Sequence, residues 1–159
     1  MVRVSLRYQF RQPFRVPAAA AFAWATDFRP TDAAIFGDRR TRSVRRLAPD
    51  TVVMTDTTFP DGRRVRIDRL VRVFPEARAW TNTHLSGPYR YSQFWYRIVP
   101  DGPRRSHLEF HGLQLTDRPR ALTPAELRRE SEAVRRSDAA TWRQKLGPAL
   151  ERALAAPRP

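Results

Sequence analysis

Several polar side chains in the middle of the chain fall on the strand face that also carries valines. In segment 64–74, Arg69 lies on the same face as the valines. Directly opposed residues of a hairpin share a face, so pairing Phe74 with Ala79 across the short loop places His84 beside Arg69. A buried histidine next to an arginine stays neutral near pH 7, because desolvation and the like charge both disfavour its protonated form. His84 is therefore a candidate for proton transfer, although a hydrogen-bonded core histidine would show the same pattern.

The same pairing argument extends this face into the following segments. Pairing Leu85 with Tyr89 continues it through Arg90 and Ser92, and a slip of one residue in any loop would move every later side chain to the other face. The face then divides into two levels. The polar level contains Arg69, Asn82, His84, Arg90, Ser92 and Gln114, and the apolar level contains Val73, Trp80, Phe94, Tyr96, Ile98, Leu108 and Phe110.

Two arginines on an inward face need partners, because an unpaired buried charge is costly. Arg69 and Arg90 can be satisfied by a carboxylate or phenolate of a ligand. They can equally pair with acidic residues of the chain, for which Asp56, Asp68 and Asp138 are the candidates. Recognition of an acidic ligand and an internal ion pair therefore both remain open.

Aromatic residues and one helix supply the remaining candidates. Trp80 and Tyr96 can stack on a ligand or fill the core, and the phenol of Tyr96 is a second candidate for proton transfer. Ser131 and Asp138 lie on the inward stripe of the helix predicted near the C-terminus. The complete predicted ligand-binding set is Arg69, Trp80, Asn82, His84, Arg90, Ser92, Phe94, Tyr96, Ser131 and Asp138.

Other kinds of chemistry have little support. The chain has no cysteine, which excludes disulfides, thiolate catalysis and cysteine-bound metals. His107 and His111 flank Glu109 at alternate positions, a spacing seen in metal sites, but in this register they face outward. The sequence also lacks a serine–histidine–acid spacing, a phosphate-binding loop and a dinucleotide fingerprint. We expect neither a metal nor a cofactor.

The segment 122–156 predicts a long amphipathic helix around which the other elements are arranged. Thr123 and Glu126 form a capping-box pattern, with Pro124 at the first helical position. Gly147-Pro148 should kink or restart the helix. Its apolar stripe consists of Leu127, Val134, Trp142, Leu146, Leu150 and Leu154.

The rest of the chain predicts strands and two short helices. Segment 4–16 reads as a first strand, followed by short helices over 18–25 and 32–36. Short connections containing proline or glycine separate the later segments, which predicts an antiparallel meander. Its six strands are expected at 41–47, 51–59, 64–74, 79–85, 89–99 and 106–115.

This order of elements resembles the helix-grip fold of the SRPBCC or START-related superfamily, which includes polyketide cyclase/dehydrase-like and birch-pollen-allergen proteins. Local likeness lies in Phe14-Arg15-Val16-Pro17, Phe22-Ala23-Trp24, Thr26-Asp27-Phe28 and the final helix through Trp142 and Leu146. The fold class implied is α+β, with a curved seven-stranded antiparallel sheet wrapped around the C-terminal helix and two short helices after the first strand. The resemblance also implies a cavity for apolar or amphipathic ligands between the sheet and this helix, in proteins that include both binders and enzymes.

Length and composition favour one folded domain over residues 1–159. Hydrophobic residues make up 41% of the chain, which argues against disorder over most of its length. No apolar window reaches the length of a membrane span, and the first residues lack an apolar signal region. We therefore expect a cytoplasmic protein without a membrane span.

The charge is strongly positive, with 30 Lys+Arg against 16 Asp+Glu and a net charge of +14. Such a field favours anionic partners, but arginines spread along a solvated surface give the same total. The first hypothesis is binding or carriage of a hydrophobic or amphipathic small molecule, including an anionic one. The second is an aromatase/cyclase-like enzyme that uses His84 or Tyr96. The third is non-specific nucleic-acid binding, which rests on charge alone and lacks a clustered basic and aromatic surface.

Overall fold

The computed structural model of the chain describes residues 1–155, so the predicted helix end at Ala156 lies outside the described residues. Within them the chain forms seven strands, helices α1 to α3 and several short helical turns. The elements are β1 (Val2–Phe14), α1 (Ala18–Ala25), η1 (Pro30–Phe36), β2 (Thr41–Ala48), β3 (Thr51–Thr58), η2 (Pro60–Gly62), β4 (Val65–Phe74), η3 (Pro75–Ala77), β5 (Ala79–His84), β6 (Gln93–Pro100), β7 (Ser106–Arg118), α2 (Pro124–Thr141), η4 (Trp142–Leu146) and α3 (Gly147–Ala155).

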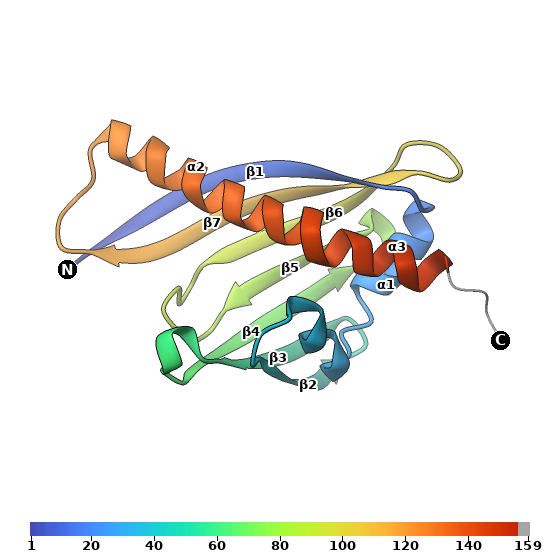
Figure 1. The fold of residues 1–159 in the computed structure, drawn as a ribbon, viewed down its shortest axis with the longest axis horizontal. Helices are drawn as coiled ribbons and strands as arrows, with labels where there is room; N and C mark the ends of the chain where they lie inside the picture. The colour runs from blue at the N-terminus through green and yellow to red at the C-terminus, as the bar shows by residue number, and fades with distance from the viewer. Residues whose placement is uncertain (156–159) are drawn as a thin grey trace.

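All the strands belong to one antiparallel sheet in the order β1-β7-β6-β5-β4-β3-β2. The long helix formed by α2, η4 and α3 crosses one face of this sheet diagonally, and α1 and η1 lie on the same side (Figure 1). This arrangement confirms the predicted fold class, a curved sheet around a C-terminal helix with short helices after the first strand. The second short helix is a 3₁₀ helix that starts two residues earlier than predicted.

The predicted pairing of β4 with β5 is confirmed residue by residue. Phe74 pairs with Ala79, and Arg69 pairs with His84. Beyond β5 the predicted hairpin is wrong, because β6 begins at Gln93 rather than at residue 89. Residues 87–92 form successive turns, in which Tyr91 adopts a positive φ of 71°.

The true β5–β6 register differs from the predicted one by two residues, with Asn82 opposite Phe94. Side chains alternate with a period of two along a strand, so a shift of two preserves the face of each residue. Phe94 and Tyr96 therefore still face the helix, and Ile98 pairs with Leu108 as predicted. The shift therefore causes a wrong assignment of faces only for residues that precede β6.

The long helix begins as its capping pattern predicts. The hydroxyl of Thr123 accepts a hydrogen bond from the N–H of Glu126, and the Glu126 carboxylate accepts one from the N–H of Thr123. At the Gly-Pro pair the helix widens into the π-helical turn η4, where the Gly147 N–H donates to the carbonyl of Trp142, and it restarts as α3. A Cβ on Gly147 would lie 2.9 Å from that carbonyl, so the wide turn needs glycine there.

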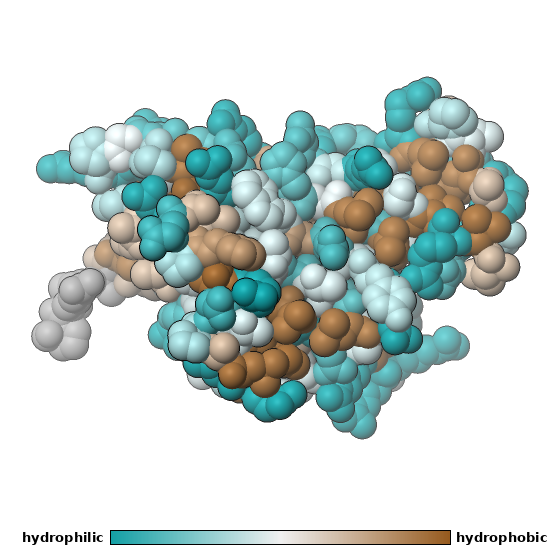
Figure 2. Space-filling model, turned by 180° about the vertical axis from the view of Figure 1, so that it is seen from behind, coloured by the Kyte–Doolittle hydropathy of each residue, from teal (hydrophilic) through white to brown (hydrophobic). Residues whose placement is uncertain are grey.

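One hydrophobic cluster fills the space between the sheet and the helices. It joins inward residues of the strands, such as Phe10 and Ile98, to Trp142 and Leu150 of the long helix. Seen from behind, the surface alternates between hydrophilic and hydrophobic residues (Figure 2). No helix within residues 1–155 is long and apolar enough to cross a membrane.

Candidate functional site

A cavity of about 470 Å³ lies between the inner face of the sheet and the middle of the long helix, residues 138–146. This volume falls within the range of small-molecule sites, roughly 300–1,000 Å³. Asp138, Trp142 and Lys145 line it from the helix, and Ile35 and Phe36 line it from η1. The sheet contributes its inward side chains from β2 to β7, among them Arg42, Met54, Arg69, Asn82, Phe94 and Phe110.

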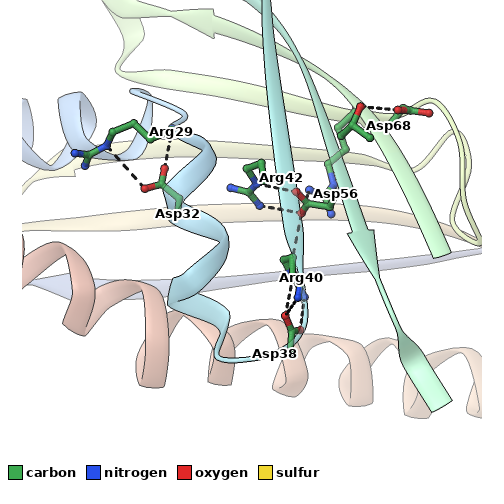
Figure 3. Close-up of polar contacts among 9 residues, drawn as sticks. Arg29, Asp32, Asp38, Arg40, Arg42, Asp56 and Asp68 are labelled. Atoms are coloured by element: carbon green, nitrogen blue, oxygen red, sulfur yellow. Dashed lines mark hydrogen bonds and ion pairs between the residues drawn. The ribbon is translucent and has the colours of Figure 1, made fainter. Parts of the chain in front are cut away.

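One end of the cavity is charged, because three arginines surround the fully buried carboxylate of Asp56. Arg42 binds it with two hydrogen bonds, from Nε to Oδ1 at 2.7 Å and from Nη2 to Oδ2 at 2.9 Å. Nη1 of Arg69 donates to Oδ2 at 2.7 Å. Nη1 of Arg40 lies 3.7 Å from the same oxygen, and its Nη2 binds Asp38 at 3.0 Å. Figure 3 shows Arg42 beside Asp56, and Arg40 between Asp56 and Asp38.

These contacts define the arginine cluster: Arg40, Arg42 and Arg69 with Asp56 and Asp38. Burial alone raises the pKa of Asp56, but the hydrogen bonds and charges of Arg42 and Arg69 outweigh it and hold this pKa at about 2. Asp56 is therefore ionised near neutral pH. Three guanidinium groups against two carboxylates leave one positive charge in excess, and all three arginines line the cavity.

His84 lies next to this cluster, directly opposite Arg69 in the register. Burial and the charge of Arg69 lower the pKa of His84 to about 4, although Asp56 acts in the opposite direction. The imidazole is therefore neutral at pH 7, as the sequence predicts. Its Nδ1 is buried and has no hydrogen-bond partner among the described residues.

A second polar group, Tyr8 and Asp138, connects β1 with α2. The Tyr8 hydroxyl donates to Oδ2 of Asp138 at 2.5 Å. Burial raises the pKa of Asp138, and the hydrogen bond from Tyr8 offsets this only in part. Burial and the charge of Asp138 also raise the pKa of Tyr8 above its ordinary value. Asp138 is thus a carboxyl group that takes up a proton more readily than an exposed aspartate, and it lines the cavity.

Aromatic rings form much of the wall between these polar groups. Trp80 and Tyr96 stack with ring centroids 4.8 Å apart and an interplanar angle of 4°. Phe110 meets the edge of Tyr96 at 5.0 Å, and Phe94 lies against His84 at 5.1 Å. Burial, followed by the charge of Asp138, raises the pKa of Tyr96, so its phenol stays protonated near neutral pH. The wall suits a flat apolar or aromatic ligand.

Seven of the ten predicted ligand-binding residues line this cavity, and their role in binding stays a prediction. They are Arg69, Trp80, Asn82, His84, Phe94, Tyr96 and Asp138.

The other three predicted residues lie elsewhere. The inward assignment of Arg90 is wrong: it is exposed in the β5–β6 connection, where its guanidinium lies 4.6 Å from the centre of the Tyr91 ring. Ser92 is buried, but its hydroxyl accepts from the Leu115 N–H at 2.8 Å and so fastens the start of β6 to β7. Ser131 is half-buried on α2, on the helix half that does not line the cavity.

Sequence reasoning missed several residues that now belong to the site. Arg42 pairs directly with Asp56 across the β2–β3 hairpin, so the register of that hairpin would have identified it. Tyr8 lies in the alternating buried pattern of β1 with Leu6 and Phe10, which signalled an inward face. Arg40 precedes β2, and no periodic pattern in the sequence marks its direction.

Of the alternating histidines of β7, which the register places on the outer face, His111 is exposed and His107 is not. His107 is buried, and its Nδ1 lies 2.7 Å from the carboxylate of Asp101. His111 is exposed and meets the edge of Trp95 at 5.4 Å. No cluster of three or more potential metal-binding side chains occurs in the part of the chain that the structure describes.

The sequence matches no protein-family model and no curated protein. Solved structures with the same architecture do exist. The Zhui aromatase/cyclase from Streptomyces sp. R1128 is 17% identical, with a TM-score of 0.77 over 96% of this chain and 98% of that one. A START superfamily protein from Mycobacterium smegmatis is 13% identical, with a TM-score of 0.66 over 92% and 98%.

A third neighbour is norcoclaurine synthase from Thalictrum flavum, solved in complex with dopamine and hydroxybenzaldehyde. It is 10% identical, with a TM-score of 0.70 over 98% of this chain and 91% of that one. The TM-scores establish a shared architecture, whereas identities this low leave the ligand open. The chain thus has the helix-grip fold, which it shares with these aromatase/cyclase and START structures.

Proposed function

We propose that the protein binds or carries an amphipathic small molecule in the cavity, with an acidic group of that molecule at the arginine cluster. The observation that carries this proposal is the charge excess of the cluster: Asp56 and Asp38 neutralise two of three arginines that face the cavity. An anionic group of the ligand would balance the third. The aromatic wall around Trp80 and Tyr96 would hold the apolar body of the same ligand.

The geometry also favours an anion over a neutral group. Of the side-chain nitrogens of Arg69, only Nη1 donates a hydrogen bond to an acceptor within residues 1–155. The other N–H groups of this guanidinium therefore remain available to a ligand. Asp56 holds the guanidinium groups in place, which reduces the ordering cost of binding. Guanidinium groups bind carboxylates with two parallel hydrogen bonds more readily than they bind neutral acceptors.

Titration calorimetry with naphthoate and its uncharged analogue naphthamide tests the proposal. The parent protein should bind both ligands and should prefer naphthoate. Substituting Arg69→Met removes one charge while keeping much of the side-chain volume. It should therefore weaken naphthoate binding by about 2–5 kcal/mol and change naphthamide binding much less.

The matched control is Arg45→Met, which removes the same charge from an exposed residue of β2 that does not line the cavity. This control should leave the naphthoate preference unchanged. If neither ligand binds the parent, the cavity is not a site for such molecules. If both bind and Arg69→Met affects them equally, the acidic group does not lie at the arginine cluster.

A second candidate function is an enzyme of the aromatase/cyclase kind. The observation in its favour is that His84, a neutral imidazole, and Asp138, a carboxyl group whose pKa is raised by burial, both line one cavity and can exchange protons with a ligand there. The two functions differ in the fate of the ligand. Mass spectrometry of a ketone-rich substrate analogue recovered after incubation would show an unchanged mass for a carrier, and loss of water for a cyclase.

A further inference from the structure

Asn82 lines the cavity, and its side chain carries a hydrogen-bond acceptor without a partner within residues 1–155. Its Oδ1 is buried and has no hydrogen-bond partner among the described residues. An amide oxygen can only accept hydrogen bonds. Nearly all buried polar atoms in folded proteins have a partner, so the exceptions indicate a group that something else must satisfy.

The two residues directly opposite Asn82 do not provide this partner. Asn82 is flanked across β4 by Val71 and across β6 by Phe94, and neither side chain carries a polar hydrogen. Polar neighbours on the same face are His84, two positions further along β5, and Arg69, diagonally across β4, and neither donates to this oxygen. The Nδ1 atom of His84 is also buried without a partner in the described part of the chain, and its ring lies against Phe94. No described residue donates to Oδ1 of Asn82, which leaves a molecule in the cavity as a source of the donor.

We propose that the ligand carries a hydroxyl or N–H group that donates to Oδ1 of Asn82, in addition to the acidic group at the arginine cluster. This inference rests on the proposed function and narrows the ligand to hydroxylated or amino-substituted acids. His84 offers a second polar atom on the same side, so a ligand with two such groups can satisfy both.

The register gives a lower limit for the spacing of the two ligand groups, because the Arg69 guanidinium donates to Asp56, which lies opposite Ile67 and further from Asn82. His84 lies directly opposite Arg69, and Asn82 lies two residues from His84 along the strand. Two residues of a strand span about 7 Å. A donor on the ring of a naphthalene remote from its carboxylate matches this spacing, whereas a donor adjacent to the carboxylate does not.

The experiment measures the affinities of positional isomers of hydroxynaphthoate by titration calorimetry. Each is compared with the corresponding methoxynaphthoate, which has no donor, and with naphthoate itself. Isomers with the hydroxyl on the remote ring should bind the parent protein about tenfold more tightly than their methoxy counterparts, as one additional net hydrogen bond would give. Aminonaphthoates show whether N–H serves as well as O–H.

Asn82→Leu should abolish the gain from the hydroxyl and leave the affinity for naphthoate within about threefold, since the arginine cluster is untouched. It should also leave the melting temperature of the ligand-free protein unchanged or higher, because it removes an unpaired buried acceptor. The matched control is Thr83→Val, which removes a hydroxyl from the neighbouring residue outside the cavity lining and should keep the gain.

Equal affinities of hydroxy and methoxy isomers in the parent protein would overturn the inference, because a bound water would then satisfy Asn82. Persistence of the gain in Asn82→Leu would overturn it as well. Binding of naphthoate without any gain from a hydroxyl refutes this inference and leaves the proposed function intact. Absence of binding by every naphthoate refutes both.

Discussion

Asp56 is the residue on which the charged end of the cavity depends. Its carboxylate is fully buried and accepts hydrogen bonds from Arg42 and Arg69. Removing one partner of a buried ion pair is costly because it leaves the other charge desolvated and unpaired. The cluster therefore orients its arginines only as long as this carboxylate is ionised.

We expect Asp56→Asn to lower the free energy of unfolding by about 3–5 kcal/mol, because both arginines lose their counter-charge. Urea denaturation of the variant and the parent at pH 7 measures the difference. Asp61→Asn is the control, since it makes the same charge change at an exposed turn residue with a positive φ of 50°, which asparagine tolerates. A loss below about 1 kcal/mol for Asp56→Asn would show that the arginines do not need this carboxylate.

The same residue predicts a pH dependence. The pKa of Asp56 is depressed in the folded protein, from 3.8 to about 2. Its contribution to stability is therefore complete above about pH 4 and disappears as the pH falls from about 4 towards 2. The stability difference between the parent and Asp56→Asn should shrink over this interval, and a difference that stays constant down to pH 2 would contradict the assignment.

At the scale of elements, β1, β7 and α2 are joined by the contact between Tyr8 and Gly112. These residues pair directly, and a Cβ on Gly112 would lie 2.6 Å from Cζ of Tyr8. The ring thus lies over the glycine, and its hydroxyl reaches Asp138 on the helix. Glycine in β7 permits this close approach, which sets the position of the helix over the sheet.

Gly112→Ala should destabilise the protein by about 1–3 kcal/mol, because the added methyl displaces the Tyr8 ring in a packed interior. Thermal or urea unfolding measures this loss. The informative control repeats the substitution in a Tyr8→Ala background, where the space above position 112 is free. A similar loss in both backgrounds would show that the cost comes from the strand backbone and not from the ring.

The elements were largely predictable from local signals, whereas the site was predictable only in part. Capping residues and turn residues act over a few positions, so the start of the long helix and the β4–β5 hairpin followed from the sequence. The β5–β6 connection did not, because its turns depend on a positive φ at Tyr91, a residue type that rarely adopts one. Arg90 was misplaced for this reason.

The arginine cluster shows a different limit of sequence reasoning. Alternation along β4 put Arg69 on the inner face, and the structure places it there. Alternation cannot show that Arg40, from outside any strand, turns back towards Asp56 at 3.7 Å. Such a contact depends on the path of the chain between η1 and β2, which is set by tertiary packing.

At the scale of the whole molecule, most of the net charge of +14 comes from arginines outside the cavity. Many exposed arginines pair with acidic neighbours, as Arg3 does with Asp117 and Arg120 with Glu126. Exposed ion pairs of this kind contribute little to stability. The other basic residues are spread along the sequence, and together they surround the molecule with a positive field.

This field predicts weak binding to DNA without sequence preference. Basic side chains release counterions from phosphates, so the logarithm of the affinity should fall linearly with the logarithm of the salt concentration. Fluorescence anisotropy with two duplexes of equal length and different sequence, over a salt series, measures this dependence. Both duplexes should bind equally, and naphthoate in the cavity should not compete with either. Sequence-selective binding that persists at about 0.5 M salt would instead require a defined nucleic-acid surface on this fold.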